Sequence, residues 1–283
     1  MTISKFEKFI IKHTEITCIV IVIILILFKS ILMKHDFNFI NTIPVVAIFV
    51  FAEGLCIFVT SNIRNRMNNF YSTDLNPDAS ILLLNQYLDI TKKDNDIYSK
   101  INYYFDLMTY YSAKGEYEPV IDLCTKIRRD CFKKKIEKSY DLSLRLFLAH
   151  AYLNRREKFL YDKEIECVRE EMSKTKLTKH IIAHQFTDVR LLEESLYHGN
   201  DPKFETKVFD FLYEKNSKGK QKNKKPSNIQ LISAYGLLLN YYKLNEEVQK
   251  ATEYANKIIG MGNEQLAVYR AAKEYLDNAN KGN

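Results

Sequence analysis

Two pairs of residues have types and spacings that could support chemistry. His180 and His184 are four residues apart, so on a helix they would share one face and could hold a metal ion. In the zinc-protease helix the first His of such a pair is followed by Glu, whereas here it is followed by Ile181. Cys124 and Cys131 would lie on one helix face, about 10 Å apart along its axis. We therefore predict no metal site, a structural or surface role for the histidines, and core thiols.

Other signatures of catalysis are absent from the sequence. It contains no phosphate-binding loop, no dinucleotide fingerprint and no nucleophile elbow. The five Cys are irregularly spaced, which argues against a disulfide framework. We therefore expect no catalytic residues, no cofactor and no enzymatic activity.

Two apolar runs, at 16–33 and 43–60, indicate a membrane-spanning hairpin. Each would form about 27 Å of helix, close to the thickness of a bilayer core. No cleavage motif follows the first run, which disfavours a signal peptide. Lys and Arg precede the first run within 1–15 and follow the second, whereas the connecting segment 34–42 is poor in them. We therefore expect a multi-pass protein of the cell membrane, with an external loop at 34–42 and both termini in the cytoplasm.

Two polar residues interrupt these apolar runs. Lys29 lies near the end of the first run, where its ammonium can reach the interface. Glu53 lies near the centre of the second run, where a carboxylate is costly and usually faces a partner. Three interpretations of Glu53 are open: a pair with Lys29, a protonated side chain bonded to a neighbouring helix, or a role in proton or ion coupling. In a hairpin the two residues would be offset by about 9 Å along the axis, which is poor geometry for a direct pair.

From residue 77 onward, amphipathic helical stripes alternate with short polar breaks. Within 101–127, Gly115 is preceded by Tyr104, Leu107 and Tyr111 at helical spacing and followed by an aromatic residue. This segment resembles a tetratricopeptide repeat, in which two antiparallel helices meet at a short Gly-containing turn. The upstream triad recurs three times, as Arg145, Leu148 and Tyr152, as Val189, Leu192 and Leu196, and as Tyr235, Leu238 and Tyr242.

The sequence therefore predicts an all-α protein, in which an N-terminal transmembrane helical hairpin precedes an α-solenoid of about four antiparallel helix pairs plus capping helices. Residues 61–76 are expected to be a linker and 77–283 the cytoplasmic repeat domain. Capping helices are predicted at Asp78–Ile90 and Glu264–Leu276, because an end repeat would otherwise expose its apolar face. Asn263 is the expected N-cap of the second capping helix.

The resemblance to tetratricopeptide repeats implies binding of a protein or peptide partner. Tyr103 and Tyr110 lie off the triad face and are predicted to line the concave surface of the array. The net charge of +7 is concentrated beside the apolar runs and in residues 215–225, which argues against nucleic acid as the partner. That loop is either a solvated connector or a contact with anionic lipid. Its basic residues are Lys215, Lys218, Lys220, Lys222, Lys224 and Lys225.

These features favour a membrane-anchored cytoplasmic adaptor or scaffold whose helical repeat array binds a protein or peptide. The alternative is a small subunit of a membrane transport or secretion complex that engages partner helices through Glu53. A third hypothesis is a peptide-sensing regulator that signals through another protein. Neutralising Glu53 would separate the first two, since a plain anchor should tolerate the change.

Overall fold

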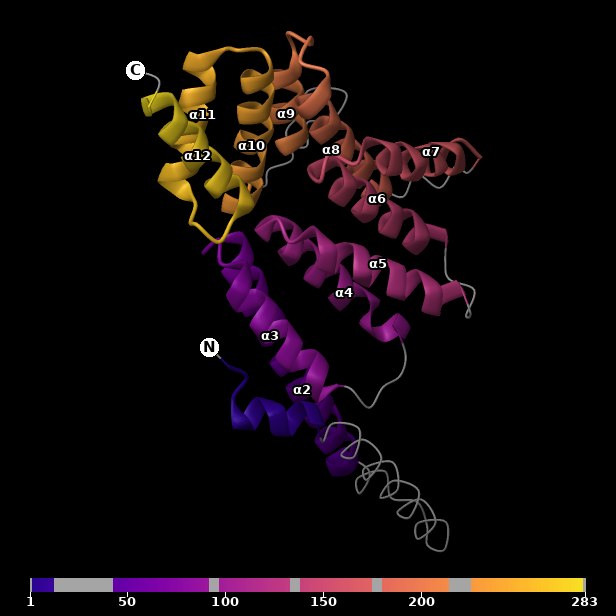
Figure 1. Ribbon diagram of the computed structural model, residues 1–283. Coiled ribbons are helices and arrows are strands. Elements are labelled where there is room, and N and C mark those ends of the chain that lie inside the picture. Colours follow the sequence, from indigo (N-terminus) through magenta and orange to yellow (C-terminus); the bar gives the residue numbers. More distant parts are fainter. Residues whose placement is uncertain are drawn as a thin grey trace, which may run out of the picture. The chain divides into compact units, whose positions relative to one another are not determined.

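The structure is a computed structural model that describes residues 2–12, 43–91, 97–132, 138–174, 180–213 and 225–281. All regular secondary structure in these ranges is helical, which confirms the predicted all-α, repeat-like class for this part of the chain (Figure 1). The chain divides into two compact units. The N-terminal unit comprises residues 1–69 and 82–95, and the C-terminal unit comprises residues 70–81 and 96–283.

The N-terminal unit contains helical residues 5–12, most of α2 (Ile43–Ser72) and the second half of α3 (Pro77–Ile90). Ser4 and Glu7 form a capping box, in which each side chain accepts the other residue's backbone N–H, at 3.1 and 2.8 Å. The Ile3 N–H donates to Gln86 Oε1 at 2.9 Å, which ties the start of the chain to α3. The core of this unit is made of Ile3, Val59, Ile63, Met67, Leu83, Leu84 and Tyr87.

The predicted membrane hairpin is only partly covered by the structure. The first run, 16–33 with Lys29, and the loop 34–42 lie outside the described residues. The second run forms the N-terminal part of α2, which continues without a break through the expected linker as far as Ser72. In the part of the chain that the structure describes, no helix is both long and apolar enough to cross a membrane. The hairpin therefore stays a prediction from sequence.

The C-terminal unit is an array of helices joined mostly by short turns (Figure 1). Within it α4 packs on α5, α6 on α7 and α10 on α11, and α8 contacts both α6 and α10. The helices are α4 (Ile97–Lys114), α5 (Tyr117–Phe132), α6 (Lys138–Asn154), α7 (Lys158–Lys174), α8 (His180–Tyr197), α9 (Phe204–Leu212), α10 (Asn228–Leu244), α11 (Val248–Met261) and α12 (Ala267–Lys281).

Three of the helix pairs are joined by the same turn. Gly115, Arg156 and Glu246 adopt left-handed φ values of 75°, 63° and 59°. The residue after each of them donates its N–H to the carbonyl five positions back, which is the bond of a Schellman motif. These are the positions at which the spacing of the triads places the turns of the first, second and fourth units. The third connection differs, because α8 ends at Tyr197 and α9 begins only at Phe204.

The last helix of the array returns to the first pair. α12 packs on α10 and α11 and also contacts α4. A Cβ added to Gly115 would lie 2.9 Å from Cβ of Ala267, so the glycine serves both the turn and the approach of α12. Asn263 Nδ2 also donates to the carbonyl of Leu75 at 2.7 Å. The two ends of the C-terminal unit are therefore held together.

α12 begins three residues later than the predicted capping helix. Asn263 Oδ1 accepts the N–H of Gln265 at 3.0 Å in a short turn, so the regular helix starts only at Ala267. The predicted first capping helix coincides with α3, but from Leu82 onward that helix belongs to the N-terminal unit.

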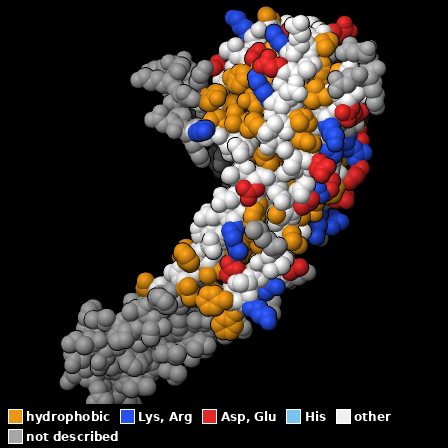
Figure 2. Space-filling model, turned by 90° about the vertical axis from the view of Figure 1, so that its left-hand side faces the viewer, with side chains coloured by type: hydrophobic (Ala, Val, Ile, Leu, Met, Phe, Trp, Pro, Cys, Tyr) orange, Lys and Arg blue, Asp and Glu red, His pale blue; other side chains and the backbone are white. Residues whose placement is uncertain are grey.

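The surface is mixed in charge on the face shown in Figure 2. Lys and Arg side chains are interspersed there with Asp and Glu, and apolar side chains gather in separate clusters. No basic patch therefore dominates the described residues on that face.

Candidate functional site

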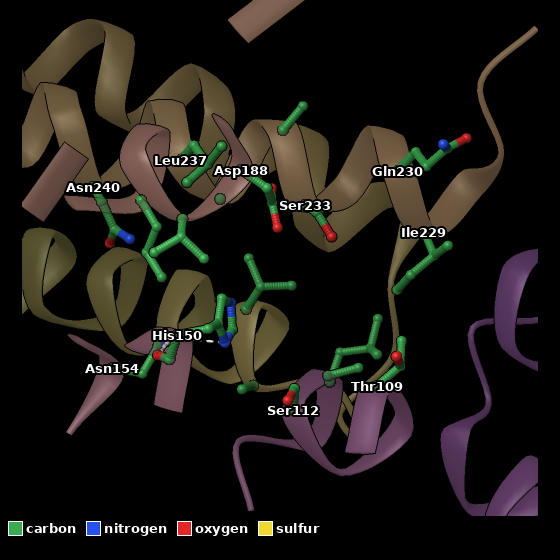
Figure 3. Close-up of a pocket in the computed structure, with 18 of the residues that line it drawn as sticks. Thr109, Ser112, His150, Asn154, Asp188, Ile229, Gln230, Ser233, Leu237 and Asn240 are labelled. Atoms are coloured by element: carbon green, nitrogen blue, oxygen red, sulfur yellow. Dashed lines mark hydrogen bonds between the residues drawn. The ribbon is translucent and has the colours of Figure 1, made fainter. Parts of the chain in front are cut away.

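The C-terminal unit contains an open cavity of about 620 Å³ between α4, α6, α8, α9, α10 and α12. This volume lies within the range of about 300–1,000 Å³ that is common for ligand pockets. Its apolar wall includes Leu146, Val189, Leu192, Leu237 and Val268. Polar side chains point into the same space from several helices (Figure 3).

Equivalent positions of the repeated helices supply part of the polar wall. Thr109, His150 and Asn240 each lie six residues before a left-handed turn residue, and all three line the cavity. Because the turns are alike, the residues six positions before them on α4, α6 and α10 all face the cavity. Three helices therefore contribute polar groups to the cavity from one equivalent position.

Some of these polar groups are satisfied within the chain. Thr109 Oγ1 donates to the Phe105 carbonyl at 2.9 Å, and Asn154 Nδ2 donates to the His150 carbonyl at 2.9 Å. Gln185 Oε1 accepts from Ser143 Oγ at 3.0 Å. These bonds fix the side chains in place, which preorganises the wall.

Other groups in the cavity remain open. Asp188, Ser233 and Asn240 make no hydrogen bond or ion pair with the described residues, although all three line the cavity. The buried Ser112 Oγ likewise has no partner among the described residues. Asp188 and Ser233 are exposed and Asn240 is half-buried, so their polar atoms are accessible to water or to a ligand in the cavity. Ser112 Oγ is the buried atom among them, and such atoms are usually bonded.

Two ionisable groups of the cavity wall, His150 and Asp188, have pKa values shifted in opposite directions. Burial lowers the pKa of His150 to about 4, so its imidazole is neutral at pH 7. Water reaches Asp188 through the cavity, but the surrounding protein removes part of its hydration and raises its pKa to about 6. Burial also raises the pKa of Tyr71, so that its phenol stays neutral. At neutral pH the carboxylate of Asp188 therefore places a negative charge on the cavity wall.

The predicted concave residues lie elsewhere. Tyr110 is only 3% exposed and packs against Tyr71, with ring centroids 4.9 Å apart. Tyr103 is half-buried, and neither tyrosine is among the residues that line the cavity. Tyr71 covers Tyr110, which is why Tyr110 is not open to a partner.

The other predicted residues are covered only in part. The His184 ring lies 4.3 Å from the Phe211 ring at the cavity wall, and the His180 side chain is outside the described residues. In the described part of the chain no group of three His, Cys, Asp or Glu could hold a metal ion. Cys124 is buried, with Sγ 3.2 Å from Met108 Sδ.

The candidate membrane and lipid contacts lie largely beyond what the structure describes. Of the Lys loop only Lys225 is described, and it is exposed. Lys215, Lys218, Lys220, Lys222 and Lys224 lie outside the described residues, as do Lys29 and the side chains of Glu53 and Cys131.

Sequence reasoning singled out His184 and the triad Val189, Leu192 and Leu196, which line the cavity, but only as a histidine pair and a helix-packing stripe. It did not single out Asp188, Ser233 or Asn240. The register of Gly115 would have located His150 and Asn240, because each is a polar residue at the same offset within an apolar stretch. Asp188 follows His184 by four residues, so the spacing that flagged the histidines also places this carboxylate on their face.

No protein-family model, curated protein or solved structure matches this chain.

Proposed function

We propose that the protein is a membrane-anchored adaptor whose C-terminal unit, a tetratricopeptide-like array, binds an extended peptide segment of a partner in its cavity. The observation that carries this proposal is the set of open hydrogen-bonding side chains, Asp188, Ser233 and Asn240, within a largely apolar cavity. Such a wall offers area for apolar side chains and a few fixed polar contacts, as ligand sites usually do.

A peptide fits the chemistry of this wall better than a compact polar molecule. The Asn240 side chain has both a donor and an acceptor, so it can pair with a backbone amide of any sequence. Thr109, His150 and Asn240 recur at one register on three helices, and an extended chain that crosses the cavity can contact polar groups from more than one of them.

Membrane anchoring is supported by the sequence and by the N-terminal unit. The apolar runs 16–33 and 43–60 are the main argument. In addition, Phe6 and Phe9 are 62% and 60% exposed on the helical segment that precedes the first run. Lys5, Lys8 and Lys12 are exposed on the same segment, and this combination suits a membrane interface.

Peptide selection with the purified full chain in detergent micelles tests this function. A displayed library of random peptides would be enriched on the parent protein and then measured against Asn240→Leu. We expect the affinity of the enriched peptides to fall by about tenfold, because the apolar side chain cannot pair with a backbone amide.

Asn102→Leu is the matched control, since Asn102 is exposed on α4 and does not line the cavity. Failure to enrich any peptide, or equal binding to the Asn240→Leu variant and the parent, would contradict a peptide site in the cavity.

A further inference from the structure

Asp188 is a carboxylate that faces the cavity without a cation of its own. It lies on α8 and points into the same space as Ser233 of α10, opposite His150 of α6 (Figure 3). It makes no ion pair with the described residues. Neighbouring acids on the same helix differ, since Glu193 and Glu194 both pair with lysines.

No cation of the described cavity wall is paired with Asp188. Arg156 also lines the cavity, but it makes no ion pair with Asp188, and its guanidinium lies 5.6 Å from the centre of the Tyr197 ring. His150 is neutral at pH 7 because burial lowers its pKa. Among the titratable groups of the wall, His184 packs against Phe211, and Tyr71 and Tyr117 stay protonated because burial raises the pKa of each.

A charge in such a place acts on a ligand more strongly than a charge on an open surface. The protein walls lower the effective dielectric, so attraction to an opposite charge within the cavity is screened less than in water. A ligand without a cation would instead remove the remaining water from Asp188 and leave the carboxylate unpaired, which is costly. The cavity therefore favours positively charged ligands and disfavours acidic ones.

We propose that the cavity selects peptides that carry a positive charge, and that this charge pairs with Asp188 between α8 and α10. The inference rests on the proposed peptide-binding function and adds the chemical class of the ligand. The cation is an organic ammonium or guanidinium group, supplied either by a Lys or Arg side chain or by a free N-terminus. Asp188 and His184 are fewer ligands than the four that a zinc ion usually takes, so a bound metal fits the wall less well.

The test uses short fluorescent peptide pools of neutral residues and the full chain in detergent micelles. One pool contains a single Lys, one contains a single Glu and one contains neither. Each is made with a free and with an acetylated N-terminus, and the fluorophore is at the C-terminus. Anisotropy titrations at pH 7 give the affinities. We expect the pools with a cation and no Glu to bind at least about tenfold more tightly than the acetylated Glu pool, which carries no cation.

Variants of Asp188 test whether its carboxylate causes the preference for cationic peptides. Asp188→Asn should reduce the difference between the Lys and Glu pools to about threefold or less, and Asp188→Lys should reverse it. Asp122→Asn is the matched control, because Asp122 is exposed on α5 and outside the cavity. Circular dichroism melting curves verify that each variant is folded. Loss of the preference on acetylation alone would identify the N-terminal ammonium as the cation, and its persistence in the Lys pool would identify the side chain.

The outcomes separate this inference from the proposed function. Equal binding of all pools, or an unchanged preference in Asp188→Asn, would overturn the charge selection and leave peptide binding intact. Absence of binding by every pool to the parent protein would overturn both.

Discussion

Two carboxylates on α8, five residues apart, have opposite surroundings. Glu193 is only 4% exposed and accepts hydrogen bonds from Lys158 Nζ and Tyr161 Oη, both at 2.7 Å. It also pairs with Arg190. Burial alone would raise the pKa of Glu193, but the hydrogen bonds of Lys158 and Tyr161 and the charge of Arg190 outweigh it and lower the pKa. The protein itself therefore supplies the partners of the Glu193 carboxylate.

Asp188 faces the cavity with no such partners. Loss of hydration raises its pKa to about 6, in the direction opposite to the shift at Glu193. The comparison shows that one helix can hold a carboxylate that contributes to the fold and another that works against it. Within the described residues, the chain supplies three partners to Glu193 and none to Asp188, so the carboxylate of Asp188 is available to an external partner.

The largest expected effect on stability comes from removing the Glu193 carboxylate. Glu193→Ala removes the acceptor of Lys158 and Tyr161, and we expect the free energy of unfolding to fall by about 2–3 kcal/mol. Lys158 and Arg190 remain partly exposed and can be hydrated, which keeps the loss below the cost of breaking a fully buried pair. Urea denaturation of the full chain in micelles, followed by circular dichroism, measures the change.

Glu253→Ala is the control for this prediction. Its pair with Lys257 is solvent-exposed, so the expected loss is below about 1 kcal/mol. If Glu193→Ala loses no more stability than Glu253→Ala, the partners of Glu193 contribute no more than a surface ion pair. The contrast between Glu193 and Asp188 would then not hold.

A smaller effect should follow when Asp188 is given a partner within the chain. Ser233→Lys places an ammonium near the carboxylate, because the two side chains point into the same space (Figure 3). We expect a gain of up to about 1 kcal/mol in the free energy of unfolding, and loss of cationic peptide binding. Ser233→Gln is the matched neutral variant and should give no gain, and an equal gain from both would mean that charge is not the cause.

The smallest effect is a difference in pH dependence between Asp188→Asn and the parent. The raised pKa means that the folded state holds a proton on Asp188 between the ordinary value of 3.8 and about 6, where the unfolded state has lost it. The Asp188 contribution therefore weakens folding as pH rises through this range. Asp188→Asn should be more stable than the parent at pH 7, and the advantage should disappear by pH 4.

The same comparison controls for the other titrating group of the cavity. The pKa of His150 is lowered from 6.5 to about 4, so its contribution to stability is lost as pH falls, with the opposite slope. Both proteins contain His150, and the difference between their denaturation curves isolates Asp188. A difference that does not change between pH 4 and pH 7 would mean that the carboxylate is normally hydrated.

The local parts of the fold could be predicted from the sequence, and the contacts between distant parts could not. The helical periodicity and Gly115 were enough to place three equivalent turns, since a turn depends on residues close in the chain. The return of α12 to the first pair depends on Ala267 meeting Gly115 and on Asn263 meeting Leu75, and no periodic pattern links such distant positions.

The same limit explains the candidate site. An amphipathic helix permits a polar residue wherever it meets water, so Asp188 and Asn240 read as ordinary surface positions until the surrounding helices are known. Tyr103 and Tyr110 were expected on the concave wall from their place on one helix. Only the tertiary structure reveals that Tyr71 covers Tyr110.

The identical geometry of the turns at Gly115, Arg156 and Glu246 has a consequence for how such a protein can evolve. Duplication of a helix pair between two of these turns would insert a whole module in register, and it would add another wall position equivalent to Thr109, His150 and Asn240. Point mutation at those positions would then change which ligand groups each wall residue can bind. Duplication of a helix pair and substitution of a wall residue would be separate genetic events. The length of the array and its ligand selectivity can therefore diverge independently.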